Sequence, residues 1–213
     1  MTESETELSK QSITSAQKNK LGEFAKVIII ALVVAVVLRA WVVEPRYIPS
    51  GSMEPTLLVN DRVLVDKISY RFHPPQRGDI LVFYPPYDDD KAYIKRLIAV
   101  GGDRIAIHDG QVFVNQQPLY EPYIAEPPNY ELEELVVPPS YLWVMGDNRN
   151  NSNDSHVWGF LPMKNVIGKA VLRFFPFDQR IGILRVSQTN MSSAGRGRVS
   201  RKYQTKNIIS SLV

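Results

Sequence analysis

The sequence contains no cysteine, which excludes disulfide bonds, a thiolate nucleophile and cysteine-bound metals. Histidine is scarce as well: His73, His108 and His156 stand far apart, without the His-Glu-x-x-His spacing of zinc hydrolases. We therefore expect neither a metal nor another cofactor. The formal net charge is only +3, which is too small to indicate binding to nucleic acid.

Acidic residues are absent after Asp178, whereas arginines and lysines continue toward the end of the chain. This pattern predicts a basic, disordered tail over residues 188–213, with attraction to anionic lipid as the alternative interpretation. Residues 1–23 are polar and rich in Ser, Thr, Glu and Lys, so we expect a flexible arm at the other end.

One long apolar run lies near the N-terminus, from Val27 to Val43, and Arg39 is its only charged residue. Extended back to Phe24, the run is long enough as a helix to cross a hydrocarbon layer of roughly 30 Å. We therefore predict a transmembrane helix over residues 24–43. A cleavable signal peptide and a buried core helix are the alternatives.

The charges around this run predict its orientation in the lipid bilayer. Positive charges before a span favour a cytoplasmic N-terminus, so the rest of the chain would lie on the exported side of a cell membrane. The lysines before the run are Lys10, Lys18, Lys20 and Lys26.

Beyond Glu44, short apolar runs rich in β-branched and aromatic residues alternate with Gly, Pro, Asp and Asn. These features predict a mainly β domain over residues 44–187, with antiparallel sheets of sandwich or barrel type. Within it, residues 101–140 form a small β/loop excursion, because "HDGQ" indicates a hairpin and the Pro-rich stretch from Gln117 to Pro139 indicates loops. The expected strands lie within 62–68, 79–84, 93–100, 104–115, 141–146 and 168–175.

Ser52 in "PSGSMEPTL" (residues 49–57) is a candidate nucleophile. A serine hydroxyl needs a neighbouring base to take its proton, and no histidine of this chain has a suitable context. Lysine is the next candidate, because Ser-Lys pairs are an established variant of the serine triad. Since a solvated lysine has a pKa of about 10.4, the base must be buried to be neutral near pH 7.

Lys95 in "AYIKRLIAV" meets this requirement if the segment is a strand. Strand alternation places Lys95 on one face with Tyr93, Leu97 and Ala99. Most strand lysines reach solvent, however, and by this criterion Lys67 and Lys169 are rivals. A third stretch, "GDNRNNSNDSH" over 146–156, is typical of tight turns and by itself favours a structural loop.

Together these motifs resemble those of type I signal peptidases. The resemblance rests on "PSGSMEPTL", "RGDILVF", "YIKRLIAVGGDRI" and "GDNRNNSNDSHVWGFLP", in this order behind an N-terminal apolar span. It implies that Ser52 is the nucleophile and Lys95 the general base of a membrane-anchored serine endopeptidase. The enzyme would remove signal peptides from secretory preproteins, its partners, by cutting after small residues.

The resemblance also implies roles for the residues around this pair. Ser50, together with the Ser52 N–H, would form the oxyanion hole, and Ser152 would orient the lysine. Substrate-binding residues would be Ile48, Pro49, Met53, Leu57 and Ile94. Structural support would come from Gly146, Asp147, Asn148 and Asp154.

The last motif departs from the family pattern at one position, because His156 stands where an arginine is usual after Asp-Ser. An ion pair with Asp154 would then be weaker or pH-dependent. Two other functions remain open at this point: a self-cleaving Ser-Lys repressor, which would need a DNA-binding domain, and an anchored β-domain without catalytic activity.

Overall fold

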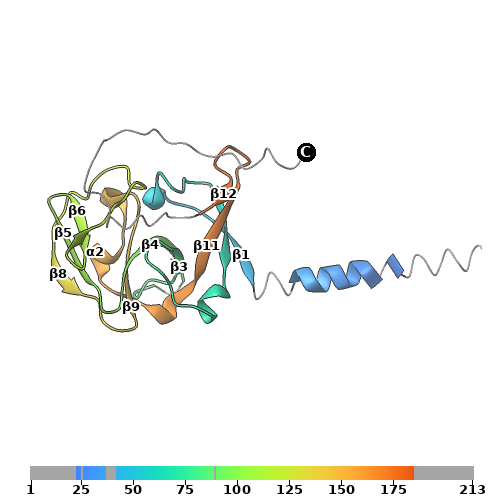
Figure 1. Cartoon of the computed structure of the whole chain (residues 1–213). Coiled ribbons are helices and arrows are strands. Elements are labelled where there is room, and N and C mark those ends of the chain that lie inside the picture. Colours follow the sequence, from blue (N-terminus) through green and yellow to red (C-terminus); the bar gives the residue numbers. More distant parts are fainter. Residues whose placement is uncertain (1–22, 25, 37–41, 89, 185–213) are drawn as a thin grey trace, which may run out of the picture.

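The computed structural model describes residues 23–24, 26–36, 42–88 and 90–184. The predicted tail over 188–213 and all but the last residue of the predicted arm lie outside these described residues. A helix covers residues 23–24 and 26–36 (Figure 1). In the described part of the chain, no helix is both long and apolar enough to cross a membrane.

The far end of the span predicted over 24–43 differs from the expectation. Residues 37–41 are not described, and Val43 begins the first strand, β1 (Val43–Tyr47). Pro45 explains the strand, because a residue before proline avoids the helical region and proline tolerates an edge position of a sheet. β1 is indeed such an edge strand and pairs only with β2.

A large antiparallel sheet forms the main body of the domain (Figure 1). Its strands follow the order β1-β2-β11-β3-β4-β9-β10, and β12 pairs with β11. The strands after β1 are β2 (Arg62–Asp66), β3 (Ile80–Phe83), β4 (Tyr93–Val100), β9 (Tyr141–Met145), β10 (Leu161–Pro162), β11 (Val166–Phe175) and β12 (Gly182–Ile183). The predicted mainly β fold with antiparallel sheets is therefore confirmed.

A smaller antiparallel sheet, with the order β7-β6-β5-β8, lies on the side of the domain away from β1 (Figure 1). Its strands are β5 (Arg104–His108), β6 (Gln111–Val114), β7 (Gln117–Pro118) and β8 (Leu132–Val136). β5 and β6 form the hairpin that "HDGQ" predicts. β8 lies within the stretch 117–139 that the sequence predicts to be loop-rich. Its mostly exposed side chains hide the strand pattern, although it pairs with β5.

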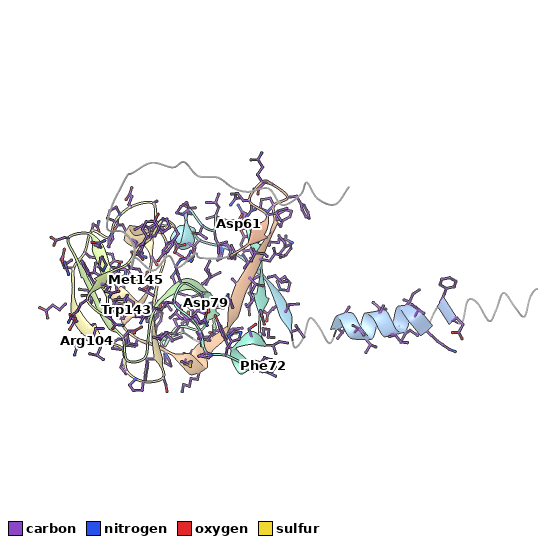
Figure 2. The ribbon with its side chains drawn as sticks, viewed as in Figure 1. Asp61, Phe72, Asp79, Arg104, Trp143 and Met145 are labelled. Carbon is purple, nitrogen blue, oxygen red and sulfur yellow. The ribbon has the colours of Figure 1, made fainter. Side chains whose placement is uncertain are left out.

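The two sheets share a hydrophobic core. Trp143 and Met145 of β9, labelled in Figure 2, pack in one cluster with Ile105 and Ile107 of β5. Short helical turns complete the domain between the strands. They are η1 (Gly51–Met53), η2 (Ser69–Arg71), η3 (Arg149–Asn151), α2 (Ser155–Trp158) and η4 (Met163–Asn165).

Candidate active site

Ser52 lies on η1, in the connection between β1 and β2, and is 8% exposed. The apolar neighbours Met53 and Leu57 are fully buried and anchor this connection in a core cluster. The loop is also closed by the Leu57 amide, which donates to the Met53 carbonyl at 2.9 Å. Burial of these two apolar residues thus holds the serine in place at the edge of the core.

Lys95 lies on β4, an interior strand that pairs with β3 and β9, and it is only 4% exposed. Its Nζ atom lies 2.5 Å from Ser52 Oγ. The two rival lysines are engaged elsewhere: Lys67 pairs with Glu44 at 3.4 Å, and Lys169 pairs with Asp79 at 2.5 Å. The structure therefore brings only one of the three candidate lysines to Ser52.

Burial favours the neutral form of this lysine. Desolvation lowers the pKa of Lys95 to about 8, although the negative charges of Asp154 and Asp147 act in the opposite direction. A pKa near 8 leaves an appreciable neutral fraction at pH 7, roughly one molecule in ten. The amine can therefore accept a proton from a hydroxyl at hydrogen-bonding distance.

The loop over residues 146–154, which follows β9, lies against Ser52 and carries the two carboxylates that act on Lys95. The Asn148 amide donates to the Ser52 carbonyl at 3.1 Å, and its side-chain Nδ2 donates to the Gly51 carbonyl at 3.1 Å. A Cβ atom on Gly146 would lie 2.4 Å from the Ser52 carbonyl oxygen and 2.2 Å from Ser152 Oγ. Only glycine fits at position 146, because any side chain would collide with Ser52 or Ser152. Asn148 holds the η1 turn through its two hydrogen bonds.

Asp154 organises the inside of the 146–154 loop and is fully buried. Its Oδ2 atom accepts from the Gly146 amide at 2.7 Å and from the Ser152 hydroxyl at 2.5 Å. The Ser152 hydroxyl thus donates to Asp154 in this structure, and its role in orienting Lys95 remains a prediction. Ser50 Oγ lies 3.5 Å from Ser52 Oγ, and its role in an oxyanion hole remains a prediction.

His156 contacts Asp154 as the sequence suggested. Its Nδ1 atom lies 2.7 Å from Asp154 Oδ1, and its ring stacks on Tyr130 with 4.1 Å between ring centroids. Asp154 also caps α2, since Oδ1 accepts from the His156 amide at 3.2 Å. The imidazole therefore occupies a defined place in the support of the 146–154 loop.

The predicted substrate-binding residues differ in exposure. Pro49 is exposed, whereas the other members of the set are at most 9% exposed and belong to one core cluster. They present little surface around Ser52, so their role as pocket lining remains a prediction. The buried members are Ile48, Met53, Leu57 and Ile94.

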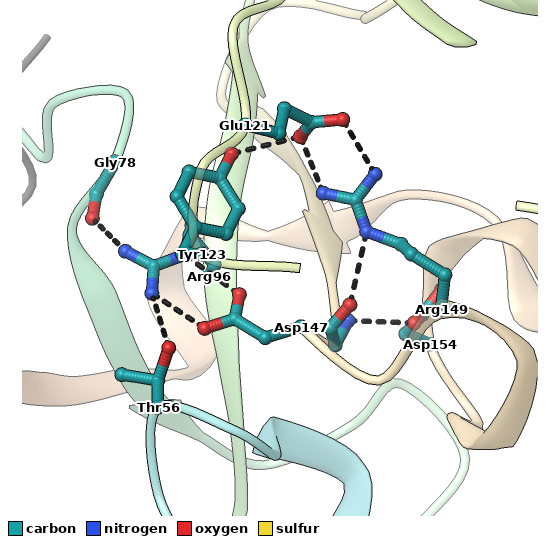
Figure 3. Close-up of polar contacts among 9 residues, drawn as sticks. Thr56, Gly78, Arg96, Glu121, Tyr123, Asp147, Arg149 and Asp154 are labelled. Carbon is teal, nitrogen blue, oxygen red and sulfur yellow. Dashed lines mark hydrogen bonds and ion pairs between the residues drawn. The ribbon is translucent and has the colours of Figure 1, made fainter. Parts of the chain in front are cut away.

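Figure 3 shows a network of buried charged side chains, of which the sequence predicts Asp147 and Asp154 but not Arg96, Arg149 or Glu121. Arg96 donates to both carboxylate oxygens of Asp147, at 2.7 and 2.5 Å, and both side chains are almost completely buried. Arg96 also donates to the Gly78 carbonyl at 3.1 Å. The only indication of this burial in the sequence is that Arg96 stands beside Lys95 within the apolar segment "YIKRLIAV", which forms β4.

Arg149 of η3 is the second buried arginine of this network. It donates to both carboxylate oxygens of Glu121, a residue of the Pro-rich stretch before β8 (Figure 3). No local pattern in the sequence singles out Glu121, because its partner lies on a separate segment. Within the described part of the chain, no three His, Cys, Asp or Glu side chains are grouped to hold a metal ion.

The chain is similar in sequence to several known proteins. Probable signal peptidase I-1 of Synechocystis sp. is 56% identical over 163 residues, covering 73% of this chain and 83% of that protein. Signal peptidase I of Leptolyngbya laminosa is 48% identical over 171 residues, covering 77% and 84%. Probable thylakoidal processing peptidase 2 of Arabidopsis thaliana is 40% identical over 183 residues, covering 83% and 50%. The family model for signal peptidase, peptidase S26, matches residues 21–175, so the chain belongs to that family.

Proposed function

We propose that the chain is a membrane-anchored serine endopeptidase that removes N-terminal signal peptides from exported preproteins. The observation that carries this proposal is the 2.5 Å separation between Lys95 Nζ and Ser52 Oγ, with both residues less than 10% exposed. Membership of the signal peptidase family supports the same reaction. A buried amine within hydrogen-bonding distance of a hydroxyl is the arrangement that a Ser-Lys mechanism requires.

The reaction begins with neutral Lys95, which takes the Ser52 proton while Oγ attacks the scissile carbonyl carbon. The oxyanion that forms accepts hydrogen bonds from the Ser52 amide and the Ser50 hydroxyl. Protonated Lys95 then gives its proton to the leaving amine as the peptide bond breaks, which leaves an acyl ester on Ser52. Lys95, neutral again, activates the water that hydrolyses this ester.

The support residues hold this geometry without reacting. Asn148 holds the η1 turn through two hydrogen bonds, and Asp154 holds Gly146 and Ser152. Asp147 remains paired with Arg96, which limits how strongly its charge favours the protonated form of Lys95.

The anchor in this proposal is the predicted span over residues 24–43, shortened at its far end because Val43 belongs to β1. The N-terminus lies in the cytoplasm and residues 44–187 lie on the exported side. Its support is that apolar side chains of the helix are exposed to between 49% and 68%, from Phe24 to Val36. A continuous exposed apolar surface of this kind favours a lipid environment over water. Because a signal peptide is itself apolar, a shared bilayer would raise the local concentration of substrate around the enzyme.

We further propose that the substrate carries small side chains before the cut. Ile48, Met53, Leu57 and Ile94 belong to one buried cluster, in which Met53 directly follows Ser52, so they leave little space for a bulky group. A preprotein with Ala immediately before the cut should be processed, and the same preprotein with Trp there should not. Equal processing of both would contradict this part of the proposal.

The central test is processing of a preprotein by the full chain and by Ser52→Ala and Lys95→Ala. Each substitution should reduce processing by at least about 1000-fold, because nucleophile and base act as one unit. Lys91→Ala is the matched control, since Lys91 is exposed and lies four residues before Lys95, in the connection that leads into β4. Undiminished processing by Lys95→Ala would favour a different base, and undiminished processing by Ser52→Ala would favour a different nucleophile. Absence of processing by the unchanged chain would instead favour a non-catalytic β-domain.

A further inference from the structure

The segment Glu121-Pro122-Tyr123, called here the 121–123 segment, reaches from the loop between β7 and β8 into the buried network beside Lys95 (Figure 3). The Glu121 side chain is 5% exposed and the Arg149 side chain 0% exposed. Arg149 Nη1 donates to Glu121 Oε2 at 2.8 Å, and Arg149 Nη2 donates to Oε1. The Tyr123 hydroxyl donates to the same Oε1 at 2.8 Å. Glu121 is thus fixed by two partners in a place without solvent.

Tyr123 contacts the other buried arginine of the network. The guanidinium carbon of Arg96 lies 4.0 Å from the centroid of the Tyr123 ring. A cation over an aromatic face is stabilised where water is excluded. The 121–123 segment therefore contacts Arg96, the chain neighbour of the candidate base, and Arg149, a member of the 146–154 loop.

The position of Arg149 links this segment to the reacting pair. Arg149 Nε donates to the Gly146 carbonyl at 3.1 Å, and the Gly146 amide donates to Asp154. Asp147 acts electrostatically on both Arg149 and Lys95. Burial disfavours the charge on Arg149, but hydrogen bonds and the charge of Glu121 more than offset this and raise its pKa. Without Glu121, the buried guanidinium of Arg149 would lose its main partner and would interact with Asp147 instead.

We propose that Glu121 and Tyr123 are positioning residues for the Ser52–Lys95 pair. Glu121 neutralises the charge of Arg149, so that Asp147 stays paired with Arg96. The pKa of Lys95 then depends on a network in which each buried arginine is paired with a carboxylate. Tyr123 covers Arg96 and holds the Glu121 carboxylate. Neither residue touches a substrate or a reacting atom in this assignment, which rests on the proposed function of Lys95 as the base.

The charges that act on Lys95 come from several elements of the fold, and their sum decides whether a substitution raises or lowers the pKa of Lys95. A positive charge left uncompensated nearby lowers the pKa of a lysine, and an uncompensated negative charge raises it. The groups that act directly on Lys95 are Tyr93 of β4 and the carboxylates Asp154 and Asp147. The charged and titratable groups linked to it through these carboxylates and their partners are Arg96, His156, Arg149, Glu121 and Tyr123.

The test compares the full chain with Glu121→Gln, Arg149→Met and the double variant. The readout is the acid midpoint, defined as the pH at which kcat/KM for a preprotein falls to half of its plateau on the acid side. Glu121→Gln leaves Arg149 uncompensated and should lower the midpoint by about half a pH unit. Arg149→Met leaves Glu121 uncompensated and should raise it by a similar amount. The double variant removes both charges and should return the midpoint close to that of the unchanged chain.

Midpoints that shift in opposite directions in the two single variants indicate positioning by charge. A merely structural role would lower kcat in both single variants without moving their midpoints in opposite directions. Glu134→Gln is the matched control, because Glu134 also pairs with an arginine, Arg104, but in an exposed position. It should leave the midpoint unchanged. If one single variant does not fold, the other single variant and the double variant still test the proposal, because the midpoint of the single variant should shift and that of the double variant should not. Coinciding midpoints among the folded variants would overturn it, whereas activity in Lys95→Ala would instead overturn the proposed function.

Discussion

Lys95 Nζ lies 2.5 Å from Ser52 Oγ, although the two residues are 43 positions apart in the sequence and lie on different elements of the fold. Lys95 is carried by an interior strand, and Ser52 by a turn that two fully buried apolar residues anchor. Both partners are therefore held by the packed core, and a preformed pair of this kind needs little rearrangement before reaction.

The pH dependence of processing should follow Lys95. Desolvation lowers its pKa to about 8, and only the neutral amine can act as a base. We expect kcat/KM to rise with pH through about 8, well below the ordinary lysine value of 10.5. A pH–rate profile measures this directly. A profile that shows no rise between about pH 6 and pH 10 would contradict a lysine base in this environment.

Substitution of the base should stabilise the fold while it removes activity. Below about pH 8 the buried Lys95 is protonated and costs stability, and the cost disappears as pH rises from about 8 to the unfolded value of 10.5. Lys95→Met should therefore raise the free energy of unfolding at pH 7 by up to about 3 kcal/mol. This gain should shrink toward pH 10.5 in denaturant titrations. The exposed control Lys91→Met should change stability by less than about 0.5 kcal/mol.

Gly146 should tolerate no side chain. A Cβ atom there would lie 2.4 Å from the Ser52 carbonyl oxygen and 2.2 Å from Ser152 Oγ, so either η1 or the 146–154 loop must move. We expect Gly146→Ala to lower kcat by about 100-fold and the free energy of unfolding by about 1–3 kcal/mol. Gly182→Ala is the control, because nothing lies within 4 Å of its added Cβ. Similar kinetics for the two alanine variants would show that this close packing is unimportant.

His156 should be replaceable by arginine but not by alanine. Arginine can restore a side-chain hydrogen bond to Asp154 Oδ1. Alanine leaves this oxygen with a single donor, the backbone amide of residue 156, and also removes the stacking on Tyr130. His156→Ala should lower the free energy of unfolding by about 1 kcal/mol, and His156→Arg should recover most of it. Thermal unfolding measures both. His108→Ala, which removes another histidine stacked on an aromatic ring, provides the comparison, and equal losses in all three variants would refute a specific role.

Several features of the site could be predicted from the sequence because they depend on short segments. The strands around Lys95 and the hairpin at "HDGQ" follow from local alternation and turn residues, and the ordered motifs indicate the family. The contact between Glu121 and Arg149 could not be predicted in this way. It joins a Pro-rich loop to η3 across 28 positions, and a glutamate in such a loop is usually solvated.

The sequence by itself determined which residues could react, since serine and lysine stand in recognisable motifs on segments with clear strand or turn character. It also determined the mainly β class, because hydrophobic periodicity is a local property. Strand alternation left three lysines as candidates and the family motifs favoured Lys95, but only the tertiary structure shows which lysine meets the serine: Lys67 and Lys169 pair with carboxylates, and Lys95 is buried against Ser52. The physical reason is that pKa and proximity depend on burial and on the charges that distant segments bring together, and neither is encoded in any one segment.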